Sequence, residues 1–148
     1  MEKEWEGASI LITGGTGTLG TAVVDRLLNY HKPRRVIVFS RDEFKQSELG
    51  KKFPQPALRL FIGDVRDPGR LRTALKDVQY VIHAAALKQV PTIEYNPIEA
   101  VNTNVVGTEN VLTACLESDV KRAVFVSTDK AVHPVNLYGA TKMTGERL

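Results

Sequence analysis

A chain of 148 residues with 43% hydrophobic and 25% charged residues has the composition of one globular domain. Its net charge of +3 is too small to indicate nucleic-acid binding. A single cysteine cannot form an internal disulfide, the charged N-terminal segment lacks the apolar core of a signal peptide, and no apolar run approaches the roughly 18 residues that span a membrane. We therefore expect a cytoplasmic protein without a nucleic-acid partner, membrane segment or metal site.

A glycine-rich turn lies between an apolar run and a helical pattern near the start of the chain. Residues 10–12 predict a buried strand, and the apolar spacing of 21–28 predicts a helix. Such a turn lets the backbone approach the phosphates of a dinucleotide, and the start of the helix then offers them its N–H groups. An ordinary glycine-rich turn is the alternative. The predicted cofactor contacts here are Gly14, Thr16, Gly17, Thr18, Leu19 and Gly20.

The rest of the sequence alternates apolar runs with helical patterns. Asp67 and Pro68 are typical of a helix start, as N-cap and first-turn residue. The alternation predicts an α/β fold, a Rossmann-like doubly wound parallel sheet that binds its ligand at the carboxyl ends of the strands. The further strands are expected at 35–39, 57–62, 78–83 and 122–127, and the helices at 43–53, from 68, at 96–117 and from 138.

The tip of the second predicted strand bears on the choice of dinucleotide. A carboxylate there bonds the free 2′-hydroxyl of NAD, whereas an arginine accommodates the 2′-phosphate of NADP. The strand ends in Ser40 and Arg41, and the first acidic residue is Asp42. Because a guanidinium pairs bidentately with phosphate, the sequence favours NADP, with Ser40 and Arg41 as contacts. The alternative is that Arg41 is an ordinary loop cation.

Small and polar residues follow the third and fourth predicted strands. Asp64 is placed to accept a hydrogen bond from the adenine amino group. The three alanines after the fourth strand leave room for the backbone to lie against the cofactor. His83, at the end of that strand, is interpreted as a packing residue rather than a catalytic one. The predicted contacts in these segments are Asp64, Val65, Ala84, Ala85, Ala86 and Lys88.

Asn104 lies on the apolar side of the helix predicted at 96–117, so its amide needs a buried partner. Two interpretations stay open. Asn104 holds the backbone of the active site, or it is a satisfied amide of the core. It is also a predicted cofactor contact. Cys115 lies on the same side of this helix and is expected to be buried.

Tyr138 and Lys142 are four residues apart, which on a helix places both side chains on one face. An ammonium near a phenol stabilises the phenolate, and such a tyrosine can take a proton from a sugar hydroxyl while a nicotinamide takes the hydride. Thr128, at the end of the fifth strand, is placed to hydrogen-bond the same oxygen. These three residues are predicted to be catalytic, and Tyr138 and Lys142 are also predicted cofactor contacts.

The glycine turn at 13–20, combined with Tyr138 and Lys142, resembles the signature of the extended short-chain dehydrogenases/reductases. More narrowly, the chain resembles the polysaccharide-biosynthesis branch of nucleotide-sugar 4,6-dehydratases, which includes the UDP-N-acetylglucosamine 4,6-dehydratases. The resemblance covers nearly the whole chain. The stretches that carry this narrower resemblance are 40–43, 83–88, 95–97 and 127–131, the last of which continues into 134–142.

The resemblance implies roles for Asp129 and Lys130 that spacing alone does not. After Tyr138 and NADP have oxidised the sugar at C4, Lys130 removes the C5 proton and Asp129 protonates the departing 6-hydroxyl; the hydride then returns to C6. Dehydratases of the glucose type usually carry glutamate where Lys130 stands, so the lysine favours UDP-N-acetylglucosamine as the substrate. The alternative is that Asp129 and Lys130 form a surface ion pair.

Members of the family are substantially longer than 148 residues. Residues 1–148 are therefore expected to be the NADP-binding and catalytic part of a longer enzyme, truncated before its nucleotide-sugar domain and inactive in isolation. The resemblance also implies a homo-oligomer and a role in the synthesis of surface polysaccharide or glycoprotein sugars. Two alternatives remain: a nucleotide-sugar 4-epimerase, which has no need for Asp129 and Lys130, and a non-catalytic dinucleotide-binding module.

Overall fold

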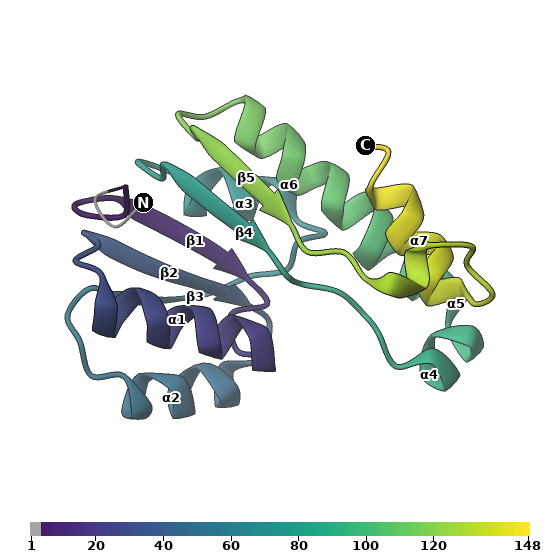
Figure 1. Ribbon diagram of the computed structural model, residues 1–148, viewed down its shortest axis with the longest axis horizontal. Coiled ribbons are helices and arrows are strands. Elements are labelled where there is room, and N and C mark those ends of the chain that lie inside the picture. The colour runs from purple at the N-terminus through teal and green to yellow at the C-terminus, as the bar shows by residue number, and fades with distance from the viewer. Residues whose placement is uncertain (1–3) are drawn as a thin grey trace.

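One parallel sheet organises the chain, with the strand order β3-β2-β1-β4-β5 (Figure 1). The computed structural model describes residues 4–148; Met1, Glu2 and Lys3, which begin the charged N-terminal segment, lie outside the described residues. The predicted α/β, Rossmann-like sheet is confirmed. Its strands are β1 Ser9–Thr13, β2 Arg35–Ser40, β3 Leu58–Ile62, β4 Tyr80–His83 and β5 Arg122–Phe125.

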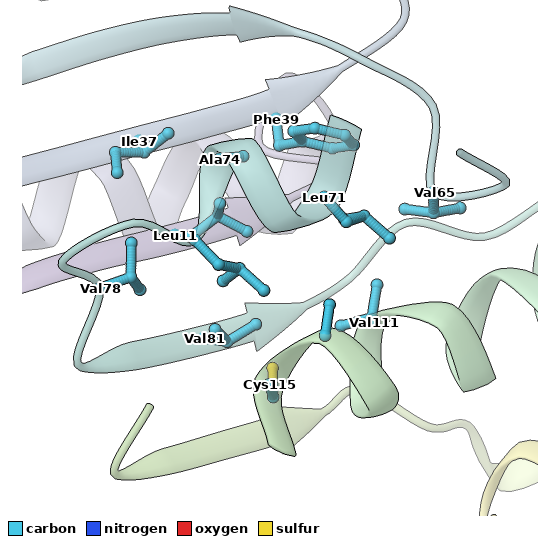
Figure 2. Close-up of a cluster of buried hydrophobic side chains, with 12 residues drawn as sticks. Leu11, Ile37, Phe39, Val65, Leu71, Ala74, Val78, Val81, Val111 and Cys115 are labelled. Atoms are coloured by element: carbon cyan, nitrogen blue, oxygen red, sulfur yellow. The ribbon is translucent and has the colours of Figure 1, made fainter. Parts of the chain in front are cut away.

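Helices cover both faces of the sheet (Figure 1). Along the central strand, Ile10 and Ile12 face α1 Thr18–Tyr30 and α2 Glu43–Lys52, whereas Leu11 faces the other side. Figure 2 shows that Leu11 there joins a cluster with residues of α3 Pro68–Ala74 and α6 Gly107–Leu116. Because successive side chains of a strand point to opposite faces, a fully buried central strand produces two separate cores.

The strand order reverses beside β1, since the chain proceeds to β2 and β3 on one side and to β4 and β5 on the other. In a doubly wound sheet, ligands bind at such a reversal, beyond the carboxyl ends of the strands. The chain crosses this edge after every strand, and α4 Val90–Tyr95, α5 Pro97–Val101 and α7 Leu137–Gly145 gather at the same end of the molecule (Figure 1).

The helix start predicted at Asp67 is confirmed. The Asp67 carboxylate accepts a hydrogen bond of 2.9 Å from the backbone N–H of Arg70, and Pro68 occupies the first turn of α3. Asp42 caps α2 in the same way, accepting from the backbone N–H of Lys45 at 2.9 Å. A carboxylate at the start of a helix satisfies an N–H group that has no partner inside the helix.

The prediction of one regular helix over 96–117 is wrong at its centre. The helix consists of α5, a π-helical turn η1 Asn102–Val106, and α6. Apolar spacing does not reveal one wider turn, because the periodicity continues on either side of it. The short α4 and the 3₁₀ turn η2 Asp129–Ala131 were also not predicted; α4 has a proline in its first turn and ends two residues before the proline that begins α5.

Cys115 is buried in the core next to α3, as predicted, and burial raises the pKa of its thiol to about 11. Among residues 4–148, no helix combines the length and apolar character needed to cross a membrane. The same residues contain no group of three or more histidine, cysteine, aspartate or glutamate side chains that could hold a metal ion.

Candidate functional site

A cavity of about 510 Å³ opens at the carboxyl ends of the strands. It extends from the glycine turn after β1, past the ends of β2, β3 and β4, to the residues after β5 and the first turns of α7. The structure brings most of the predicted site residues together around this one cavity. Those that line it are Gly14, Thr16, Gly17, Thr18, Leu19, Gly20, Ser40, Arg41, Asp64, Val65, Ala84, Ala85, Ala86, Lys88, Thr128, Tyr138 and Lys142.

The glycine turn forms one wall of the cavity by packing backbone against backbone. Gly14 has a φ of +66°, and a Cβ there would lie 2.8 Å from the backbone nitrogen of Ala85. A Cβ on Gly20 would lie 2.5 Å from the carbonyl oxygen of Gly14. Gly17, the N-cap of α1, has no side chain to bond the first N–H groups of the helix. These groups and the positive end of the helix dipole therefore remain available to an anion.

Two cations line the cavity beyond β2. The Arg41 guanidinium lies 3.5 Å from Asp64 Oδ2, and Lys45 Nζ lies 3.5 Å from Asp42 Oδ2. Both separations exceed a good charged hydrogen bond, and all four side chains are at least partly exposed, so these pairs are weak. Arg41 and Lys45 can therefore both turn toward a phosphate in the cavity.

The Asp64 carboxylate is held mainly by Arg66. It accepts hydrogen bonds from the backbone N–H of Arg66 at 2.9 Å and from the Arg66 guanidinium at 2.9 and 2.7 Å. Partial burial works to raise the pKa of Asp64, but the hydrogen bonds from Arg66 and the charge of Arg41 outweigh it and hold the pKa below its usual value. Asp64 is thus a fixed, ionised residue of the cavity lining that can accept further hydrogen bonds.

His83 faces away from the cavity. Its Nδ1 lies 2.6 Å from Thr13 Oγ1 and its Nε2 lies 3.0 Å from Thr108 Oγ1, and the side chain is buried. Burial lowers the pKa of His83 to about 3, with a smaller contribution from the charge of Lys142. Because both ring nitrogens are bonded to hydroxyls, neither is left for a substrate. The structure therefore favours the packing interpretation of this histidine.

Asn104 binds backbone and is not among the residues that line the cavity, so its predicted contact with the cofactor stays a prediction. Its Oδ1 accepts from the backbone N–H of Leu87 at 2.8 Å, and its Nδ2 donates to the Leu87 carbonyl at 2.8 Å and to Thr141 Oγ1 at 3.0 Å. Leu87 follows the alanines of the cavity wall, and Thr141 lies on α7. Of the two interpretations, the structure supports the one in which Asn104 holds the backbone of the site, as a fully bonded amide.

Tyr138 and Lys142 both project into the cavity from α7. The side-chain oxygen Oδ1 of Asn136 caps this helix by accepting from the backbone N–H of Gly139 at 2.9 Å. The Glu94 carboxylate of α4 accepts from the backbone N–H of Leu137 at 2.7 Å. Lys142 Nζ lies 3.9 Å from the centre of the Phe125 ring, a cation–π contact. These two hydrogen bonds thus hold the first turn of α7, and the contact with the Phe125 ring holds the ammonium of Lys142.

Asp129 and Lys130 do not line the cavity. Their charged atoms lie 3.9 Å apart, the Asp129 side chain is 91% exposed, and Thr128 Oγ1 donates to Asp129 Oδ1 at 3.0 Å. Both residues lie on η2, which packs against α7 just beyond the Thr128 end of the cavity. The structure places them beside the cavity as an exposed ion pair, while Thr128, Tyr138 and Lys142 lie inside it.

Several residues that line the cavity were not predicted from the sequence. Thr103 is the most informative, because its buried Oγ1 has no hydrogen-bond partner among residues 4–148 and a ligand hydroxyl or phosphate can supply one. Its neighbour Asn104 was a predicted site residue, which could have indicated that Thr103 also lies at the site. Lys45 could also have been found, since it lies four residues after Arg41 at the start of a helix. The missed residues are Phe39, Asp42, Lys45, Gly63, Thr103, Val126 and Ser127.

We expect the free energy of unfolding to depend on Lys142 in alkaline solution. Burial lowers the pKa of Lys142 from 10.5 to about 8, although the charge of Glu146 acts to raise it. Between pH 8 and 10.5 the lysine is therefore protonated in the unfolded chain and mostly neutral in the folded one. Stability should therefore rise with pH from about 8 to 10.5, by up to about 1.4 kcal/mol per pH unit. Urea unfolding of the wild type and Lys142→Met measures the difference.

Lys52→Met is the matched control, because Lys52 also lies over an aromatic ring but on the outside of the molecule. The difference between the wild type and this control should stay flat with pH. A difference between the wild type and Lys142→Met that is equally flat would show that Lys142 is protonated in the fold as it is in the unfolded chain.

The sheet, the glycine turn and the Tyr138–Lys142 pair across one cavity define a Rossmann-like fold of the short-chain dehydrogenase/reductase type. The profile of the family described as "Polysaccharide biosynthesis protein" matches residues 10–148. The chain belongs to this family.

Named relatives include both dehydratases and epimerases. The chain is 54% identical over 140 residues to a UDP-N-acetylglucosamine 4,6-dehydratase (inverting) of Campylobacter jejuni, and 47% identical over 143 residues to a UDP-glucose 4-epimerase of Rickettsia massiliae. Each match covers 95% of this chain but only 42% of the relative. The dTDP-glucose 4,6-dehydratase DesIV of Streptomyces venezuelae, solved with NAD bound, is 28% identical with a TM-score of 0.87, over 94% of this chain and 49% of DesIV.

Proposed function

We propose that residues 1–148 form the dinucleotide-binding and catalytic part of an NADP-dependent UDP-N-acetylglucosamine 4,6-dehydratase. The observation that carries the proposal is the cavity, which joins a phosphate-accepting glycine turn to Tyr138 and Lys142. The identity of 54% to the Campylobacter jejuni enzyme supports the substrate, although the chain spans only 42% of that enzyme's length. A cytoplasmic role in the synthesis of surface sugars is part of the same proposal.

The lining residues fit a bound NADP. The free N–H groups at the start of α1 suit the pyrophosphate. Arg41 and Lys45 together suit the 2′-phosphate, a group that NADP has and NAD lacks. The unpartnered hydroxyl of Thr103 and the ammonium of Lys142 are available to the ribose and phosphate oxygens. The nicotinamide, when bound, supplies a hydride acceptor and later a hydride donor.

Three residues inside the cavity serve the oxidation of the sugar. Tyr138 takes the proton of the 4-hydroxyl, and Thr128 hydrogen-bonds the same oxygen. Lys142, held over Phe125 in a buried position, presents a positive charge that stabilises the phenolate of Tyr138. With a pKa of about 8, Lys142 carries this charge at neutral pH.

The elimination requires groups that reach the C5 and C6 atoms of the sugar. A ketone at C4 makes the C5 proton acidic. A proton that passes from the Lys130 ammonium to the Asp129 carboxylate would leave a neutral amine and a carboxylic acid; the amine can then remove the C5 proton while the acid protonates the 6-hydroxyl, which leaves as water. Both side chains are exposed beside the Thr128 end of the cavity, so the proposal requires the C5–C6 side of the sugar to extend from the cavity over η2. Return of the hydride to C6 and of a proton to C5 completes a 4-keto-6-deoxy sugar.

A 4-epimerase is the second candidate, supported by the 47% identity to the Rickettsia massiliae relative. It needs Tyr138 and Lys142 but no elimination. Lys130→Ala separates the two functions. The rate of a dehydratase should fall at least about 100-fold, because the general base is lost, whereas the rate of an epimerase should stay the same.

The assay uses the natural protein that carries this sequence, UDP-N-acetylglucosamine and NMR in deuterated water. Lys121→Ala, the loss of another surface lysine, is the matched control and should keep the wild-type rate. A 4-keto-6-deoxy product that carries deuterium supports the dehydratase. Interconversion at C4 without that product would establish the epimerase, and dinucleotide binding without any change in the sugar would establish a non-catalytic module.

A further inference from the structure

A buried chain of hydrogen bonds runs through His83 from the cavity wall to the helix behind it. At one end, the backbone N–H of Ala85 donates to Thr13 Oγ1 at 3.2 Å, and this hydroxyl lies 2.6 Å from His83 Nδ1. At the other end, His83 Nε2 lies 3.0 Å from Thr108 Oγ1. Thr108 Oγ1 in turn donates to the carbonyl oxygen of Asn104 at 2.6 Å. Thr13, His83, Thr108 and Asn104 are all buried.

The backbone carbonyl of Asn104 fixes the bond directions at its end of this chain, because a carbonyl can only accept. Thr108 gives its one proton to Asn104, so it must accept from His83 Nε2. The nitrogen Nε2 therefore carries a proton. Burial keeps the ring neutral, so with its proton on Nε2 the nitrogen Nδ1 is bare and accepts the hydroxyl proton of Thr13, whose oxygen also accepts from Ala85. Only the neutral imidazole with its proton on Nε2 gives a partner to both ring nitrogens and to the hydroxyl protons of Thr13 and Thr108.

We propose that His83 is a positioning residue, locked in the neutral Nε2–H tautomer, that sets the backbone of Ala85 against the glycine turn. Gly14 packs on this same backbone, where a Cβ would lie 2.8 Å from Ala85 nitrogen. The hydrogen-bond chain thus ends at the contact between the Ala85 backbone and the glycine turn, and the dinucleotide binds against both of these segments. This consequence rests on the proposed function. Asn104, at the far end, holds Leu87 two residues further along the wall.

Protonation of His83 breaks this arrangement. An imidazolium has a proton on both nitrogens, so Thr13 would have to accept from Nδ1 and its own proton would lose its acceptor. Lys142 of α7 is the charged group that acts on the ring, and the Phe125 ring of β5 lies 5.8 Å from it, centre to centre. A second buried positive charge near Lys142 is unfavourable, so the neutral tautomer persists well into acid solution.

The direct test is the tautomeric state of His83 in the 148-residue chain, read from the ring nitrogen-15 shifts between pH 8 and pH 5. His31 and His133 provide internal references in the same spectrum. The expected result is one Nε2–H tautomer for His83 throughout. A Nδ1–H tautomer, a mixture of the two, or an imidazolium at pH 7 overturns the proposal.

A second measurement tests the positioning role without any cofactor. Thr108→Val removes the acceptor of His83 Nε2 and should accelerate exchange of the Ala85 amide about tenfold. Thr73→Val is the matched control, since Thr73 Oγ1 also donates to the carbonyl four residues earlier, at 3.1 Å, but on the surface. Thr108→Ser restores the hydroxyl and should restore slow exchange. Equal exchange in Thr108→Val and Thr73→Val overturns the role.

Dinucleotide titration of the same variants separates this proposal from the proposed function. If the wild type binds a dinucleotide, Thr108→Val should weaken binding about tenfold and Thr108→Ser should recover it. Unchanged affinity in Thr108→Val overturns the positioning role. If the wild type binds neither NADP nor NAD, the proposed function fails, and the tautomer and the Ala85 exchange still decide the role of His83.

Discussion

Replacing Gly20 by alanine should lower the free energy of unfolding by about 3 kcal/mol and weaken dinucleotide binding about 100-fold. The new Cβ would lie 2.5 Å from both the carbonyl oxygen of Gly14 and the Cα of Gly15. Both are backbone atoms of the turn, so the methyl group can be accommodated only by moving the turn away from α1. The glycine turn that lines the cavity would then lose its shape, and the fold would lose stability. Urea unfolding and calorimetric titration measure the two effects.

Gly17→Ala is the matched control in the same turn. A Cβ there would meet only the Gly14 carbonyl oxygen, at 3.3 Å, so the stability should change by less than about 1 kcal/mol. Because Gly17 lines the cavity, the methyl group should still weaken binding of the dinucleotide. Equal losses of stability in the two variants would contradict the assignment of Gly20 as the point of close contact.

The second large effect is expected for Asn104→Ala, which should cost about 3 kcal/mol or more of stability. The substitution leaves the N–H and the carbonyl of Leu87 without their partners and removes one bond to Thr141. A buried polar group without a partner pays its full cost of desolvation. We also expect faster amide exchange in α7, because Asn104 is a direct hydrogen-bond link between the cavity wall and that helix.

Asn110→Ala is the control for this prediction. Asn110 lies on the same long helix, but it makes one hydrogen bond, of 3.1 Å, to the carbonyl of Val65. Its loss should cost about 1 kcal/mol and leave exchange in α7 unchanged. A cost for Asn104→Ala no larger than that for Asn110→Ala would show that the contacts of Asn104 with Leu87 and Thr141 do not stabilise the site.

Local features of the sequence predict much of this fold. The apolar run before Gly14 and the helical spacing after Gly20 define a strand and a helix whose contacts are close in sequence. Once the strands are parallel, their carboxyl ends must meet at one edge, which is why residues as distant as Arg41, Ala85 and Tyr138 could be assigned to one cavity. Asp67 could be assigned as a cap because its partner is three residues away.

Contacts between distant segments could not be predicted in this way. Asn104 gives no local sign that its partners are Leu87 and Thr141, 17 and 37 residues away. The π-helical turn that contains Asn104 interrupts a pattern that continues on both sides. The exposure of Asp129 and Lys130 depends on how η2 packs against α7, which residue type and spacing do not determine.

Calorimetric titration of the 148-residue chain with NADP and with NAD is the direct test of the proposed NADP site. We expect NADP to bind at least about tenfold more tightly than NAD, because the Arg41 guanidinium and the Lys45 ammonium line the cavity and can pair with a 2′-phosphate. Arg41→Ala should remove this preference, Lys45→Ala should reduce it, and Arg59→Ala, which removes an exposed arginine outside the cavity, should preserve it. Equal or tighter binding of NAD, or no binding of either dinucleotide, would contradict the proposed NADP site.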